Sequence, residues 1–151
     1  MQITSPAFKD GGLIPLAFTR YGENMVPPLR WHDVPDGTRS FALLVEDTDA
    51  ERGPFPHCII YDIPAARSRI EEAETLAKDG VEFARNGFGH RRYDGPQPPE
   101  DHGAHHYHFR LAALDVDSLE IDDSADPVEV WRKACAHALA ISELVGRFGK
   151  H

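Results

Sequence analysis

The chain has 151 residues, of which 41% are hydrophobic and 27% are charged, and its formal net charge is −9 at pH 7. This length fits one domain with a continuous apolar core, and no apolar run approaches the roughly 18 residues that a membrane-spanning helix needs. The negative charge disfavours nucleic acids as partners, because the field of the whole molecule repels phosphate backbones. We therefore expect one domain over residues 1–151, with no nucleic-acid partner and no membrane insertion.

The start of the chain and its two cysteines both indicate a reducing compartment. The opening residues, MQITSPAFKDGG, have neither the basic nor the apolar segment of a secretion signal, so a cytoplasmic location is expected. Cys58 and Cys135 each lie in an apolar segment and are predicted to be small buried side chains, not a disulfide or a redox pair.

Proline and glycine interrupt the first two thirds of the chain so often that long helices are excluded there. Residues 39–47 and 57–63 have strand length, are rich in β-branched, aromatic and aliphatic side chains, and are separated by a segment with glycine and proline. They are predicted to be neighbouring antiparallel strands. Residues 16–21 and 81–85 are weaker strand candidates, and residues 67–78 fit either a short helix or an ordered loop.

The clearest strand pattern covers residues 104–114. Here four apolar or aromatic residues alternate with three polar ones, so the strand is predicted to have one buried and one wetter face. The buried set is Tyr107, Phe109, Leu111 and Ala113, and the polar set is His106, His108 and Arg110.

The last part of the chain has a helical pattern. Asp126, Pro127 and Glu129 are typical of an N-cap, a first helical residue and a capping box. Apolar residues then recur at helical spacing, namely Val130, Ala134, Ala138, Ile141 and Val145. A peripheral helix over about residues 127–146, packed on a β core, is therefore predicted.

Polar side chains stand at the ends of the apolar stripes. Asp47 ends one stripe, His57 opens the next strand, and His105 and Tyr107 begin a third. Antiparallel pairing would bring Asp47 beside His57. Imidazole and phenol groups donate hydrogen bonds to anions, and a carboxylate fixes the imidazole tautomer, while backbone N–H groups of residues 93–99 (YDGPQPP) would add donors.

Each of these residues also has a structural interpretation. A histidine at a strand end is more often a hydrogen-bonded structural residue than a ligand-binding one. Asp47 and Asp49 would shape the following loop through Asx turns, and Gly95 with Pro96 would form an ordinary turn. The convergence of several such residues makes the two interpretations about equally well supported.

The histidine-rich tract at residues 100–108 matches no closed zinc pattern, so no metal or cofactor is expected. No catalytic residue is assigned, because the chain has neither a G-x-S-x-G elbow nor an activated cysteine. An enzyme stays an alternative, in which His57 or His105, oriented by Asp47, is the general base of a hydrolysis or proton transfer.

Several ordered motifs resemble those of one known family. VEDTDA at 45–50, followed by His57, resembles the D-P-D-x-P…H signature of the phosphatidylethanolamine-binding family, in its bacterial and archaeal branch often called Raf-kinase-inhibitor-like. YDGPQPP at 93–99 with HHY at 105–107 resembles its G-x-x-P-P…H-R-Y signature. Further matches are NMVPPLRW at 24–31, VPDGT at 34–38, RNGFG at 85–89, AHAL at 136–139 and LVG at 144–146.

The chain departs from these signatures at a few positions. Thr48 and Glu51 replace the two prolines of the first signature, Cys58 replaces the tryptophan after the histidine, and His106 replaces the arginine of H-R-Y. Loss of the prolines would leave the loop after Asp47 less rigid.

The resemblance implies a mainly β fold, a sandwich with a large central antiparallel sheet, a smaller second sheet and peripheral helices. It implies a pocket for a small phosphate- or carboxylate-like anion, such as a phosphoryl headgroup. The positions that match the family's pocket are Asp47, Asp49, His57, Gly95, Pro99, His105 and Tyr107, with a backbone donor at Gln97. A homodimer and a regulatory, kinase-inhibitor-like protein interaction are expected by the same analogy.

Overall fold

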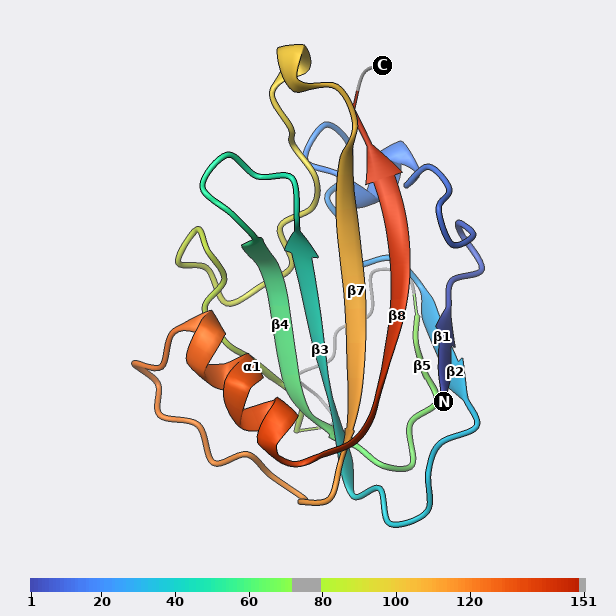
Figure 1. Cartoon of the computed structure of the whole chain (residues 1–151), viewed down its shortest axis with the longest axis vertical. Coiled ribbons are helices and arrows are strands. Elements are labelled where there is room, and N and C mark those ends of the chain that lie inside the picture. Colours follow the sequence, from blue (N-terminus) through green and yellow to red (C-terminus); the bar gives the residue numbers. More distant parts are fainter. Residues whose placement is uncertain (72–79, 150–151) are drawn as a thin grey trace.

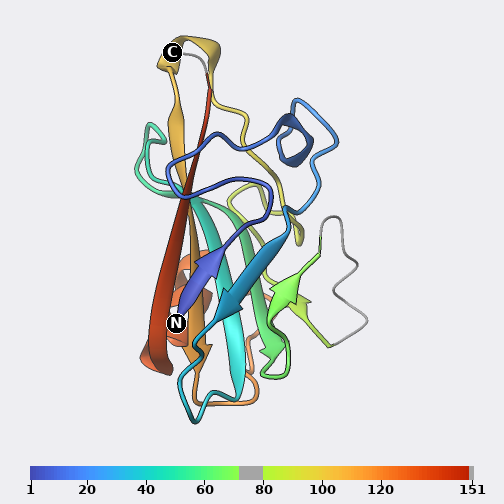
Figure 2. The same cartoon turned by 90° about the vertical axis from the view of Figure 1, so that its right-hand side faces the viewer.

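Two antiparallel sheets and one helix form the molecule, in a computed structural model that describes residues 1–71 and 80–149. The larger sheet has the strand order β6-β4-β3-β7-β8, and Figure 1 shows β4, β3, β7 and β8 side by side. Its strands are β3 (Ser40–Asp47), β4 (Phe55–Pro64), β6 (Glu82–Phe83), β7 (His105–Leu114) and β8 (Ala138–Phe148). The smaller sheet, in the order β1-β2-β5, covers one face (Figure 2); its strands are β1 (Gln2–Thr4), β2 (Leu29–His32) and β5 (Arg69–Ile70). The helix α1 (Pro127–Ala136) lies on the other face.

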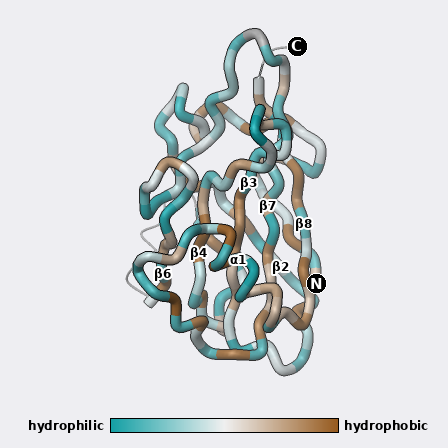
Figure 3. The backbone as a smooth tube through the Cα atoms, turned by 60° about the vertical axis from the view of Figure 1, so that its left-hand side comes forward, coloured by the Kyte–Doolittle hydropathy of each residue, from teal (hydrophilic) through white to brown (hydrophobic). Residues whose placement is uncertain are grey.

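The central strand β3 explains why the sandwich has two cores. Its residues are buried almost throughout, because alternate side chains face the small sheet and α1. One core packs Phe41, Leu43 and Val45 against the small sheet, and the other packs Ala42 and Leu44 beneath α1. Figure 3 shows hydrophobic residues along the strands under α1, whereas the loops at the end with the C-terminus are mostly hydrophilic. The predicted β-sandwich is confirmed.

The predicted C-terminal helix is wrong beyond Ala136. Residues 138–148 form β8, which pairs along the whole of β7, from His105 opposite Phe148 to Leu114 opposite Ala138. The apolar residues after Ala136 lie on both faces of the strand, with Leu139 and Ile141 exposed, and an eleven-residue strand satisfies the free edge of β7. The N-terminal half of the prediction is confirmed, since Asp126 accepts a hydrogen bond from the Glu129 N–H group.

Several smaller predictions have mixed outcomes. The strands predicted at residues 39–47, 57–63 and 104–114 are confirmed, and residues 81–85 contain the short β6. Residues 16–21 are not a strand: the 3-10 helix η1 (Leu16–Phe18) follows Pro15, whose carbonyl accepts from the Phe18 N–H group.

The segment predicted as helix or loop, residues 67–78, begins with β5, and its remainder from residue 72 lies outside the described residues. Cys135 is exposed, contrary to prediction, because it lies on the outer side of α1, whereas Cys58 is buried in β4. No described helix is long and apolar enough to span a membrane.

Candidate functional site

The end of β3 brings an aspartate and a histidine into one buried pair. Asp47, the last residue of β3, lies opposite Tyr107 of β7, and His105 lies two residues before Tyr107 on the same face. The His105 Nδ1 atom is 2.7 Å from Asp47 Oδ2, and both side chains are almost fully buried. Because a carboxylate only accepts, Nδ1 carries a proton and Nε2 is the nitrogen left for other contacts.

A second imidazole, His57 of β4, is held by the main chain instead. Its Nδ1 atom donates to the carbonyl oxygen of Asp94 at 2.6 Å. The strand pattern predicts Asp47 as the polar neighbour of His57. A register shift after Val45 instead pairs Asp47 with Phe55. The Asp47 carboxylate bonds His105. Burial lowers the pKa of His57, and the nearby Asp94 carbonyl and Asp47 charge oppose that shift only in part.

Tyr107 contributes a phenol to the same place. Its ring meets the His57 ring edge-on, with centroids 5.3 Å apart. The residue has no exposed surface, and its Oη atom has no hydrogen-bond partner among the described residues. Burial raises the pKa of Tyr107, and the charge of the Asp47 carboxylate and its contact with the hydroxyl raise it further, so the hydroxyl keeps its proton.

Aromatic side chains enclose His57 on its other sides. Phe55 and Phe88 lie with ring centroids 5.5 and 5.6 Å from the imidazole and pack edge-on against each other at 4.8 Å. Gly87 is required for this packing, because a Cβ atom there would lie 2.4 Å from the Phe55 ring. The Arg20 guanidinium lies over the Phe88 ring, 5.0 Å from its centroid, in a cation–π contact.

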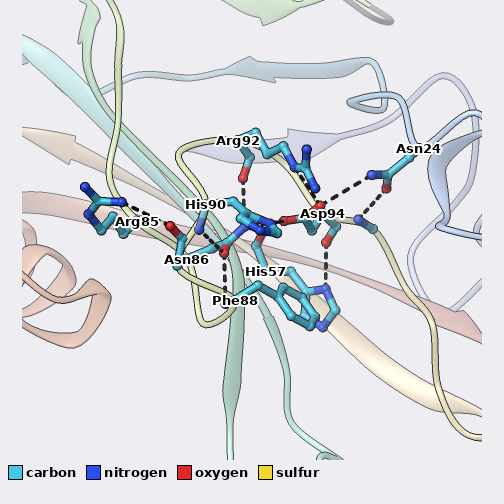
Figure 4. Close-up of polar contacts among 10 residues, drawn as sticks. Asn24, His57, Arg85, Asn86, Phe88, His90, Arg92 and Asp94 are labelled. Carbon is cyan, nitrogen blue, oxygen red and sulfur yellow. Dashed lines mark hydrogen bonds and ion pairs between the residues drawn. The ribbon is translucent and has the colours of Figure 1, made fainter.

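The loop at residues 86–95 is held by a buried polar network that sequence reasoning missed (Figure 4). Asn86 donates from Nδ2 to the His57 carbonyl and to the Asp94 carboxylate, and its Oδ1 accepts from the Phe88 and His90 N–H groups. Asn86 belongs to the RNGFG motif. This motif resembles one of the family, but it does not indicate that Asn86 holds the loop by hydrogen bonds. Asp94 had no signal beyond its place in YDGPQPP.

Of the remaining predicted residues, Gly95 is buried with its backbone beside the His57 ring, whereas Asp49, Gln97 and Pro99 are exposed. The Asp49 carboxylate bonds the N–H group and ring of exposed His106, while its own N–H donates to Asp47 Oδ1 as in an Asx turn. The Gly95 N–H donates to Asn24 Oδ1, so it is used within the protein. Gln97 and Pro99 are exposed in the loop that follows.

A cavity of about 240 Å³ lies beside the strand pair that carries His105. It is bordered by Phe148, which is the β8 partner of His105, and by Tyr21, whose ring stacks on Phe148. Pro99 lines it as well, so this predicted position borders an apolar space. Within the described residues, no group of three or more histidine, cysteine or acidic side chains is arranged to hold a metal ion.

Several known proteins are similar to this chain in sequence and in fold. A UPF0098 protein of Aquifex aeolicus is 37% identical over 150 residues, which cover 98% of this chain and 88% of the relative. The crystal structure of E. coli YbcL, described as a new member of the mammalian PEBP family, matches with a TM-score of 0.93 and 28% identity over 99% of this chain and 98% of that one. The homologue CT736 of Chlamydia trachomatis matches with a TM-score of 0.89 and 31% identity, over 99% and 97% of the two chains.

The sequence profile described as phosphatidylethanolamine-binding protein matches residues 4–149, which is nearly the whole chain. Because this match covers nearly the whole chain and the fold agrees, this protein belongs to the phosphatidylethanolamine-binding protein family.

Proposed function

We propose that this protein binds a small oxyanion, inorganic phosphate or the phosphoryl group of a larger ligand, between His57, His105 and Tyr107. The observation that carries the proposal is the buried Tyr107 hydroxyl, which makes no hydrogen bond of ordinary geometry among the described residues and has only the Asp47 carboxylate close by. Buried donors are normally satisfied, and a ligand oxygen would satisfy this one. The two imidazoles flank the phenol, one on the same strand and one against its ring.

The fixed tautomers imply that anion binding is coupled to proton uptake. Both Nδ1 atoms are used as donors within the protein, to Asp47 and to the Asp94 carbonyl, so only the Nε2 atoms remain. A neutral imidazole presents a lone pair at Nε2 and repels an anion, whereas a protonated one donates a charge-assisted hydrogen bond. The affinity for phosphate therefore rises as the pH falls through the histidine range.

Calorimetric titration with inorganic phosphate tests this function. We expect binding at pH 6 that weakens by pH 8, and a heat that depends on the ionisation enthalpy of the buffer because protons are taken up. His57→Gln and His105→Gln should each weaken the binding by about tenfold or more, since each loses a charge-assisted hydrogen bond. Absence of phosphate binding at low salt throughout this pH range would contradict the proposal.

The Asp47–His105 pair favours a second candidate, a hydrolytic or proton-transfer reaction. A carboxylate bonded to Nδ1 orients an imidazole whose Nε2 atom then acts as a general base. Turnover of a phosphomonoester that His105→Gln abolishes would support an enzyme, and a rate equal to the uncatalysed one would exclude this reaction.

A further inference from the structure

Asp94 has a carboxylate that is completely buried yet fully hydrogen-bonded. Oδ2 accepts from Asn86 Nδ2 and His90 Nδ1, both at 2.8 Å, and Oδ1 accepts from Arg92 Nε at 2.9 Å (Figure 4). The side chain has no exposed surface. Burial alone would raise the pKa of Asp94, but the bonds from His90, Asn86 and Arg92 lower it, so the group is an anion in the protein interior.

The main chain of the same residue holds His57. The Asp94 carbonyl accepts from His57 Nδ1 at 2.6 Å, and the Asp94 N–H donates to the His57 carbonyl at 3.2 Å. Asn86 donates to that same carbonyl at 3.2 Å and also to the Asp94 carboxylate. The Asn86 side chain therefore links β4, which carries His57, to the loop that orients the His57 ring.

We propose that Asp94 is a positioning residue of the anion site, which fixes His57 as the Nδ1–H tautomer and whose buried negative charge favours the protonated, anion-binding imidazole. This inference rests on the proposed binding of an oxyanion by His57. Asn86 joins Asp94 to the strand, whereas His90 and Arg92 are the partly exposed donors that keep the carboxylate ionised.

A carboxylate is needed in this place for a physical reason. The donors from Asn86, His90 and Arg92 arrive on both oxygens, and an asparagine side chain offers only one acceptor oxygen. Its amide nitrogen would face a donor, which leaves a buried polar group unsatisfied. Asp94→Asn therefore removes the charge and also loosens the loop at residues 86–95.

The charges that act on His57 come from every element around it. Asp47 faces it from β3, Asp94 from the loop, and the neutral phenol of Tyr107 from β7. Arg20 lies over the Phe88 ring, and His90 and Arg92 act on His57 through their bonds to the Asp94 carboxylate. Of these two residues, Asp94 is the one whose main-chain carbonyl bonds the His57 ring. Substitution of its carboxylate is therefore the specific test.

The experiment compares Asp94→Asn with Asp123→Asn in the whole chain. Asp123 is an exposed carboxylate paired with Arg91, so its substitution makes the same change in net charge nearby without touching the network. Nitrogen-detected NMR of the imidazoles reads the tautomer and the titration of His57, and calorimetry with inorganic phosphate reads binding at pH 5 and pH 7.5.

We expect Asp94→Asn to lower the pKa of His57 and to weaken phosphate binding by about threefold or more at pH 7.5, with a smaller loss at pH 5, where a larger fraction of the imidazole is protonated. Asp123→Asn should match the wild type. An unchanged His57 titration, or a loss of affinity that is equal at both pH values, would overturn the electrostatic role.

The NMR measurement on His57 remains decisive if the variant does not fold or if the wild type binds no phosphate. If Asp94→Asn does not fold, the wild-type spectrum still decides, because the Nε2–H tautomer of neutral His57 would contradict the bond to the Asp94 carbonyl. If the wild type binds no phosphate, the proposed function fails, while the tautomer and titration of His57 still decide whether Asp94 positions this ring.

Discussion

Two successive histidines of β7 make almost the same bond to an aspartate, but in different surroundings. His105 Nδ1 lies 2.7 Å from Asp47 Oδ2, and His106 Nδ1 lies 2.8 Å from Asp49 Oδ2. The side chains of the first pair are 5% and 7% exposed, and those of the second are 49% and 43% exposed. Successive strand residues point to opposite faces, so one pair lies inside the sandwich and the other in water. Bond geometry alone therefore does not identify a functional histidine, because burial decides how strongly the pair acts.

The largest difference between the two pairs should appear in stability. Asp47→Ala leaves the buried His105 Nδ1–H group without its acceptor and should lower the free energy of unfolding by about 3 kcal/mol. Asp49→Ala breaks a solvent-exposed pair and should cost less than about 1 kcal/mol. Urea unfolding of both variants measures the two values, and equal losses would show that burial does not separate these pairs.

Phosphate binding should separate the two histidines next. His105→Gln removes a donor from the proposed site and should weaken binding by about tenfold or more, whereas His106→Gln should change it by less than about twofold. The two substitutions are chemically identical and one residue apart, so each is the control for the other. Calorimetry with inorganic phosphate at pH 6 measures both, and a stronger effect of His106→Gln would place the anion on the exposed face.

Tyr107 offers a change that affects binding without a cost in stability. Tyr107→Phe removes a buried hydroxyl that makes no hydrogen bond of ordinary geometry among the described residues, so the midpoint of thermal unfolding should stay the same or rise. The affinity for phosphate should fall by about fivefold, the value of one neutral hydrogen bond. Tyr61→Phe, on the face beneath α1, is the control that should leave binding unchanged. A large loss of stability in Tyr107→Phe would mean that the hydroxyl has a structural partner.

The smallest effect concerns the pH dependence of stability. Since burial lowers the pKa of His57 below its ordinary value of 6.5, the unfolded chain binds its proton first as the pH falls. Stability should therefore decrease from about pH 6.5 down to the pKa of the folded protein and then level off with respect to this group. His57→Gln removes that contribution, so its stability should fall less steeply between pH 7 and pH 5 than that of the wild type. Parallel curves for the two proteins would contradict the assignment.

Most of the candidate site could be predicted from alternation along the strands. A period of two places Asp47, His105 and Tyr107 on the faces of their strands that carry buried apolar neighbours, and the pairing of β3 with β7 then brings them together. The partner of His57 could not be predicted in this way. It depends on the main chain of a loop 37 residues away, and on the buried Asn86 and Asp94 that hold this loop.

The sequence by itself determined the long strands and the start of α1, because these depend on local periodicity, strand propensity and capping, and the resemblance of its motifs to a known family implied the sandwich. It did not determine the conformation of residues 138–148, whose apolar residues fit both a helix and a strand. The free edge of β7 decided that they form a strand, since eleven residues of backbone could bond there. Tertiary structure likewise decided which group each histidine bonds. The spacing of residues along the chain predicts neither the register shift between β3 and β4 nor the position of the loop whose Asp94 carbonyl bonds His57.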